Sequence, residues 1–115
     1  FSSCSLNYTK NPYSVLSSIA KARIPMICLT RNNFSENPRP FIQLSNLSDN
    51  GVGNHLEKYK ESEVWYPAQS LSEFKIKNLF LSKEYKLIID ETIDKTGIIN
   101  KKDNYAKDLF FNLIV

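Results

Sequence analysis

The sequence predicts a small layered domain of the α/β class, or of the α+β class under one alternative, with about four short strands and about four helices. Three observations support this: a helical apolar repeat after Asn11-Pro12, an unbroken apolar run at residues 87–89, and an amphipathic pattern over residues 103–115. The chain has 115 residues, 42% of them hydrophobic, which suffices for one core. Residues 1–115 are therefore predicted to form one globular domain, and their abrupt ends are consistent with a domain excised from a longer protein.

A first helix is predicted over residues 12–23, because Asn11 is a good N-cap and Pro12 suits the first helical turn. The residues on its apolar face are Tyr13, Leu16, Ile19 and Ala20. The apolar run at residues 24–30 then predicts a buried strand, in which Pro25 is tolerated only at the beginning or on an edge.

The next stretch alternates between turn signals and a weak strand. Residues 31–39 are polar with a proline and predict a loop, whereas residues 40–44 predict a second strand. Residues 45–54 contain the turn signal Asp49-Asn50-Gly51 and predict another loop.

A short helix and a short strand are predicted next. Asn54 and Glu57 have the spacing of a capping box, which predicts a helix over residues 55–62. A strand over residues 63–66 follows, and we expect Pro67 to end it because proline lacks a backbone donor.

Residues 71–81 are open to two interpretations. Ser70 and Glu73 match a capping box, which favours a helix. Alternatively, residues 74–77 alternate at period two and residues 82–84 could form a hairpin loop, which would make the sheet mixed or antiparallel. We prefer the helix, whose apolar face would be Leu71, Phe74 and Leu81.

Residues 85–90 are predicted to be the central strand, since the run at 87–89 is apolar on both faces. Asp90, Glu91 and Asp94 lie at its carboxyl end, where open α/β sheets place ligands and where carboxylates could hold a divalent cation. Clustered acids are more often structural, so no catalytic or metal-binding residue is assigned. A small enzyme or metal site here is the weakest of three functional hypotheses.

Residues 103–115 predict an amphipathic terminal helix that packs on the sheet. Phe111 and Val115 extend the apolar surface beyond its main face, and we expect them to contact a partner protein or a second copy in a homodimer. The residues predicted to face the core are Ala106, Leu109, Phe110 and Leu113.

The two cysteines and the hydropathy bear on location. Cys4 lies in an irregular start and Cys28 in an apolar run, so both are predicted to be unpaired. Free thiols favour an intracellular location over a secreted one, without fixing the compartment. No apolar stretch is long enough to predict a membrane span.

Aromatic and basic residues provide the other binding candidates. Trp65 and Tyr66 are of the types enriched at protein interfaces, although a single tryptophan in a small domain is often part of the core. Residues 58–86 interleave lysines with aromatics, as in proteins that grip single-stranded nucleic acid, but glutamates run through the same stretch and the net charge is only +3. The lysines concerned are Lys58, Lys60, Lys75 and Lys77.

The sequence thus predicts a non-enzymatic protein–protein interaction module. Weak, salt-sensitive nucleic-acid binding is the alternative. The chain has one histidine, His55, and no glycine-rich phosphate loop, so no motif fixes a chemistry and no cofactor is expected.

Overall fold

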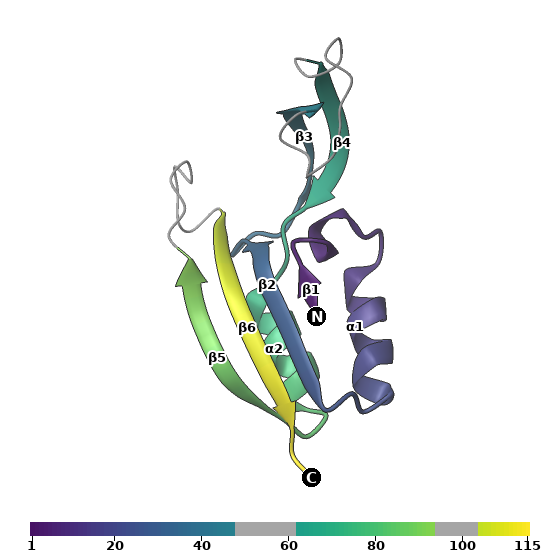
Figure 1. The fold of residues 1–115 in the computed structure, drawn as a ribbon, viewed down its shortest axis with the longest axis vertical. Helices are drawn as coiled ribbons and strands as arrows, with labels where there is room; N and C mark the ends of the chain where they lie inside the picture. The colour runs from purple at the N-terminus through teal and green to yellow at the C-terminus, as the bar shows by residue number, and fades with distance from the viewer. Residues whose placement is uncertain (48–61, 94–103) are drawn as a thin grey trace.

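A computed structural model describes residues 1–47, 62–93 and 104–115, which form an α+β domain with a projecting two-stranded arm (Figure 1). The main sheet has the strand order β1-β2-β6-β5, in which β1 is parallel to β2 and β6 is antiparallel to both its neighbours. Strands β3 and β4 form the arm. The elements are β1 (Ser2–Ser3), the 3-10 helix η1 (Leu6–Tyr8), α1 (Pro12–Lys21), β2 (Met26–Phe34), β3 (Pro40–Asn46), β4 (Glu63–Gln69), α2 (Glu73–Leu81), β5 (Tyr85–Ile93) and β6 (Tyr105–Leu113).

The described residues hold six strands and two α-helices, so a mixed domain is confirmed and the expected four strands and four helices are wrong in detail. Of the helix predicted over residues 55–62, residues 55–61 lie outside the described residues, and Ser62 is not helical. Neither described α-helix is long and apolar enough to cross a membrane.

The first helix and the strand after it are confirmed. Pro12 occupies the first turn of α1 as expected, although the side chain of Asn11 makes no capping hydrogen bond. Strand β2 runs on to Phe34, so the loop predicted from residue 31 begins later. A bulge makes this extension possible: the register shifts between Leu29 and Asn32, and Arg31 adopts a φ of 53°.

Helix α2 is confirmed against the hairpin alternative, but it begins later than the predicted capping box. Ser72, and not Ser70, is the N-cap, and its hydroxyl accepts a hydrogen bond of 3.2 Å from the backbone N–H of Lys75. The buried face is consequently formed by Ile76 and Phe80, while Phe74 is 73% exposed.

Strand β5 lies at the edge of the sheet and not at its centre, which corrects the prediction. The apolar run that suggested a central position contains a bulge between Leu87 and Ile89, and Ile88 is 55% exposed. The run is therefore not covered on both faces. The central positions belong to β2 and β6.

The predicted terminal helix is also wrong, because residues 105–113 form strand β6. Apolar residues are so frequent there that the pattern fits a period of two as well as 3.6, and hydrogen bonding to β2 on one side and β5 on the other decides between them. Consecutive residues of a strand point to opposite faces, and this reverses the positions predicted for Phe110 and Phe111. Phe111 is fully buried with 0% exposure, whereas Phe110 points to the opposite face.

The core lies between the sheet and the two helices. We call the sheet face toward α2 the inner face; in Figure 1, α2 is seen behind the strands. Rings from α2 and β6 meet in the core, where the centroids of Phe80 and Phe111 are 4.7 Å apart. Side chains of α1 complete the cluster, with Leu16 fully buried.

Candidate functional site

The arm presents an apolar surface to solvent. One of its two faces carries Ile42, Leu44, Trp65 and Pro67, which we call the arm face. Trp65 is 66% exposed and Ile42 is 62% exposed, and Leu44 lies directly opposite Trp65 on the neighbouring strand. Trp65 is therefore a surface residue, and its indole is the largest apolar group on the arm face.

Pro67 lies inside β4, although the sequence predicted that this proline would end the strand. Hydrogen-bonded and non-hydrogen-bonded residue pairs alternate between β3 and β4, and this alternation explains how Pro67 fits. Bonds from Leu47 N to Ser62 O (2.8 Å) and from Ser70 N to Arg39 O (3.0 Å) close the ladder at its two ends. Counting inward from both, Pro67 falls in a non-hydrogen-bonded pair, where a backbone N–H would point away from the partner strand. The lack of a backbone N–H at Pro67 therefore removes no hydrogen bond between β3 and β4.

The same alternation brings the arm-face side chains together. Ile42 pairs with Pro67, and Leu44 with Trp65. Both are non-hydrogen-bonded pairs, whose side chains approach more closely than those of hydrogen-bonded pairs. The arm face is therefore a continuous apolar strip.

The opposite face of the arm rests against the N-terminal segment. The rings of Tyr8 and Tyr66 form an edge-to-face contact with centroids 5.5 Å apart, and the Tyr8 hydroxyl donates to Gln43 Oε1 at 3.3 Å. Burial, reinforced by Cys4 and Tyr66, raises the pKa of Tyr8 to about 12, so the hydroxyl stays protonated as a donor at neutral pH. Tyr66, predicted as a binding residue, thus lies on the supported face.

Asn7 fixes the base of the arm to the body. Its amide nitrogen Nδ2 donates to the carbonyl oxygens of Asn33 (2.9 Å) and Gln69 (2.8 Å), and its Oδ1 accepts from Asn33 N at 3.1 Å. The side chain is almost fully buried. Gln69 Nε2 also donates to Thr9 O at 2.5 Å. Two segments far apart in sequence are thereby held at one point, which orients the arm.

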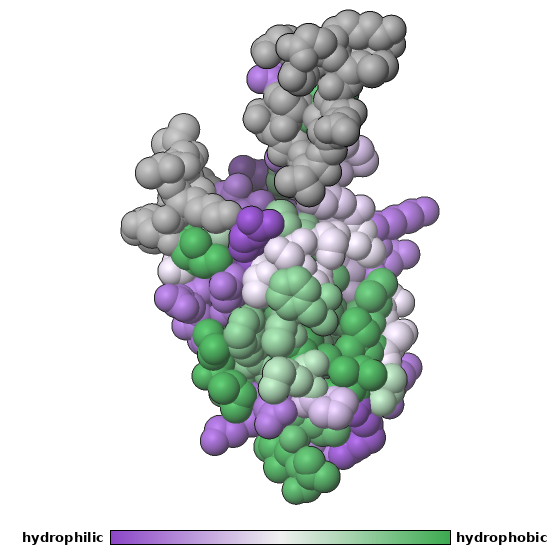
Figure 2. All heavy atoms as spheres, in the orientation of Figure 1, coloured by the Kyte–Doolittle hydropathy of each residue, from purple (hydrophilic) through white to green (hydrophobic). Residues whose placement is uncertain are grey.

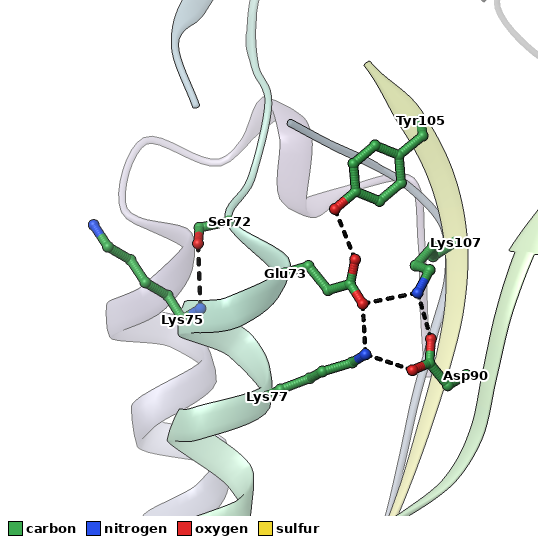
Figure 3. Close-up of polar contacts among 7 residues, drawn as sticks. All are labelled: Ser72, Glu73, Lys75, Lys77, Asp90, Tyr105 and Lys107. Carbon is green, nitrogen blue, oxygen red and sulfur yellow. Dashed lines mark hydrogen bonds and ion pairs between the residues drawn. The ribbon is translucent and has the colours of Figure 1, made fainter. Parts of the chain in front are cut away.

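A second polar assembly, the charged cluster, joins α2 to the inner face of the sheet (Figure 3). It consists of Glu73 and Lys77 from α2, Asp90 from β5, and Tyr105 and Lys107 from β6. Lys77 Nζ contacts Glu73 Oε1 at 2.5 Å and also binds Asp90, while Lys107 Nζ contacts Glu73 Oε1 at 2.7 Å and Asp90 Oδ1 at 2.6 Å. The Tyr105 hydroxyl donates to Glu73 Oε2 at 2.7 Å.

Hydrogen bonds set the protonation of this cluster. Burial alone would raise the pKa of Glu73, but donors from Lys107, Lys77 and Tyr105 outweigh it and hold that pKa below its usual value. The pKa of Asp90 is lowered in the same way by the two lysines. Burial opposes the charge of Lys77, yet its two carboxylate partners raise its pKa.

The charged cluster is internally neutral, with two lysines for two carboxylates. Burial, and next the bond to Glu73, raise the pKa of Tyr105, so its hydroxyl remains a donor. Each lysine already contacts both carboxylates, so no charge in the cluster is left without a partner. The arrangement ties α2 to β5 and β6, and chemically it is a structural clamp.

The acidic residues predicted at the end of the central strand are not brought together. Asp90 points inward into the charged cluster, whereas Glu91, the next residue of the strand, points to the opposite face. Asp94 lies outside the described residues. In the described part of the chain, no three His, Cys, Asp or Glu side chains are grouped as a metal site would require.

The lysines proposed for nucleic acid are likewise separated or outside the described ranges. Lys77 is engaged in the charged cluster, and Lys75 Nζ lies 5.6 Å from the ring centroid of Tyr13. Lys58 and Lys60 are not described. No continuous lysine surface joins Lys75 to Lys77, since their side chains have different partners.

The two remaining residues that were predicted to contact a partner lie in different environments. Phe111 lies in the core and is not available at the surface, and Val115 is fully exposed beyond the end of β6. Cys4 and Cys28 are both free. Asn7 and the charged cluster were not predicted from the sequence, although Glu73 and Lys77 lie four residues apart on one helix, a spacing that favours an ion pair.

Comparison of the chain with protein-family models, with curated proteins and with solved structures found no match in any of the three.

Proposed function

We propose that this domain is a non-enzymatic protein-interaction module that binds an extended apolar segment of another protein along its arm. The observation that carries the proposal is the 66% exposure of Trp65 within the arm face. Fully burying a large apolar side chain contributes about 1.5–3 kcal/mol, so a partner that covers this strip gains affinity at once. Tryptophan is also among the residues that most often dominate binding energy at interfaces.

The backbone of the arm favours one edge for that segment. Ile42 and Leu44 sit in non-hydrogen-bonded pairs, so their N–H and C=O groups point away from β4, and among the described strands only β4 pairs with β3. The outer edge of β4 is less suited, because Pro67 offers no donor there. A strand added to β3 would align its own alternate side chains with the arm face.

The orientation of the arm also supports this role. Asn7 and the Tyr8–Tyr66 contact support the arm from the side opposite to the arm face. A surface held in place before binding loses less conformational entropy when the partner arrives.

Site-specific photocrosslinking tests the proposal. A photoreactive amino acid replaces Trp65 in one variant and Phe74 in a matched control, since Phe74 is an equally exposed aromatic on α2. In cells that produce the protein, we expect an adduct with another protein from position 65 only. Equal adducts from both positions, or none from position 65, would contradict the proposal.

The adduct is then identified by mass spectrometry and its purified chain is titrated against the wild-type domain. Trp65 is the sole tryptophan, so a blue shift of its emission reports directly on burial of the arm face. Ile42→Pro removes an outward donor without touching the ladder to β4, and Ile42→Ala keeps that donor but truncates the side chain. Strand addition predicts weaker binding by Ile42→Pro than by Ile42→Ala; equal affinities would rule out the β3 edge.

A further inference from the structure

The sheet has a second exposed surface, which is independent of the arm. Residues directly opposite one another on paired strands point to the same face, so the register defines rows on the face away from α2, which we call the outer face. Three rows precede the row of Asn33, Ala106 and Ile93, which ends the face. The middle row is apolar. Two of the rows cross all three strands, Met26–Asn112–Lys86 and Cys28–Phe110–Ile89, and in the third Asp108 of β6 pairs with Glu91 of β5 beside the bulge of β2.

No described element covers these rows. The viewer of Figure 1 faces the outer face, with α2 behind it, and Figure 2 shows apolar residues gathered there. Met26 is 61% exposed and Ile89 is also exposed, although both belong to the strands of the main sheet. A sheet that packs a core on one side only leaves such a surface available for a partner.

Charge is distributed unevenly across the outer face. One end carries Lys86 beside the amide of Asn112, and the other carries Glu91 beside Asp108. Asp108 Oδ1 accepts from the backbone N–H of Arg31 at 2.7 Å, and the Arg31 side chain turns to Ser3 Oγ (3.2 Å). The face therefore has a basic end, an apolar middle and an acidic end.

We propose that the outer face binds a second copy of this chain, sheet against sheet, about a two-fold axis that runs across the strands along the middle row. This operation places the basic end of one copy over the acidic end of the other. Lys86 then faces Glu91 and Asn112 faces Asp108, each twice, while Phe110 meets its own counterpart. A two-fold interface requires self-complementarity of this kind.

The size of the face sets the expected affinity. The three rows span about five residues of each strand at about 3.3 Å per residue, on strands about 4.8 Å apart, so the area that the axis brings together is roughly 16 by 15 Å. This is smaller than the about 800 Å² per partner of a standard interface, so we expect a dimer with a micromolar dissociation constant.

Analytical ultracentrifugation from low to high micromolar concentration tests the dimer. Wild type should pass from monomer to dimer, Phe110→Lys should remain monomeric, and Trp65→Ala should dimerise like wild type. A wild type that stays monomeric throughout overturns the inference, as does a dimer lost in Trp65→Ala but kept in Phe110→Lys. Neither result bears on binding of a different protein by the arm.

Charge exchange tests the geometry without altering the apolar middle. Lys86→Glu and Glu91→Lys should each weaken self-association by about tenfold or more, because each places like charges together twice. A mixture of the two variants should restore dimers, since every facing pair then has opposite charges. Failure of the mixture to associate better than either variant alone overturns the proposed axis.

Crosslinking provides an independent readout of the same geometry. The axis places Cys28 over Cys28 of the other copy, across sheets about 10 Å apart, which a short bis-maleimide can span. In a Cys4→Ser background we expect covalent dimers that disappear on adding Cys28→Ser. Absence of covalent dimers at a concentration where ultracentrifugation shows association would overturn the sheet-on-sheet arrangement.

Discussion

The sheet and the arm are both built from alternating strands, yet each places a large aromatic residue in a different environment. In β6 of the sheet, Phe111 is fully buried against Phe80, whereas in β4 of the arm Trp65 faces solvent. The sheet has α2 to cover one face, whereas among the residues that the structure describes the arm has the N-terminal segment on one side and no layer on the other. Alternation alone therefore determines which residues share a face, and the neighbouring layer determines whether that face is core or contact surface.

The largest effect should come from Phe111. Phe111→Ala removes a fully buried ring from the centre of the core, and we expect it to lower the free energy of unfolding by about 3–5 kcal/mol. Urea denaturation measures it at low protein concentration, where self-association is minor. Phe110→Ala is the matched control on the opposite face, and it should lower the free energy of unfolding by less than half as much as Phe111→Ala. Equal losses would mean that both faces of β6 are covered.

Asn7 tests whether the arm depends on the body. Asn7→Ala removes the donor to the Gln69 carbonyl and the acceptor of the Asn33 N–H, while the Asn33 carbonyl keeps its bond from Leu71 N, and we expect a loss of about 2–3 kcal/mol. Hydrogen exchange should show faster exchange in β3 and β4 than in β6. Uniform acceleration in all strands would show that the arm is not a separate unit of stability.

The charged cluster should contribute less than the core, because it is partly exposed to water. Glu73→Gln removes the carboxylate that both lysines share, and we expect a loss of about 1–2 kcal/mol at neutral pH. Thermal melts measure it. Lys83→Gln, which changes a charge outside the cluster, is the control and should have little effect.

The same cluster predicts a pH dependence. The folded-state pKa values of Glu73 and Asp90 are lowered from their usual 4.5 and 3.8, so their stabilisation is complete above those usual values. It is lost as the pH falls through the lower, folded-state values. Wild type should therefore lose stability on acidification through this window, and Glu73→Gln should lose less. Parallel pH profiles for the two proteins would show that Glu73 is not responsible.

The smallest effect on stability, and the sharpest contrast with Phe111, should come from Trp65. Because its indole is largely in water already, Trp65→Ala should change the free energy of unfolding by no more than about 0.5 kcal/mol. Acrylamide quenching of the wild-type tryptophan fluorescence, which comes from this residue alone, should be strong and typical of a largely exposed indole. A protected indole would remove the basis for the arm face as a binding surface.

Local signals predicted much of this fold. Helix α1 follows from Pro12 and its apolar repeat, and β3 from its short apolar run. Strand β6 could not be predicted in this way, because Leu109, Phe110 and Leu113 satisfy a helical repeat and only pairing with distant strands selects the other period.

The candidate site was predicted only in part. The residue type of Trp65 pointed to an interface, but its exposure depends on which other segments pack on the arm, and no local pattern in the sequence records that. The clustering of Lys107 with Asp90 likewise depends on the register between β5 and β6, where the bulge after Leu87 determines which side chains face α2.

The position of β6 has a consequence for how the chain folds. Strands β2 and β5 have no contact in the sheet except through β6, which follows both of them in the sequence. During synthesis they must wait, each with an unpaired edge, until residues 105–113 have left the ribosome. Pairing over such sequence distances is slow, and open apolar edges are prone to aggregation while it is incomplete. Completion of the sheet therefore depends on the strand that is last of the four in the sequence.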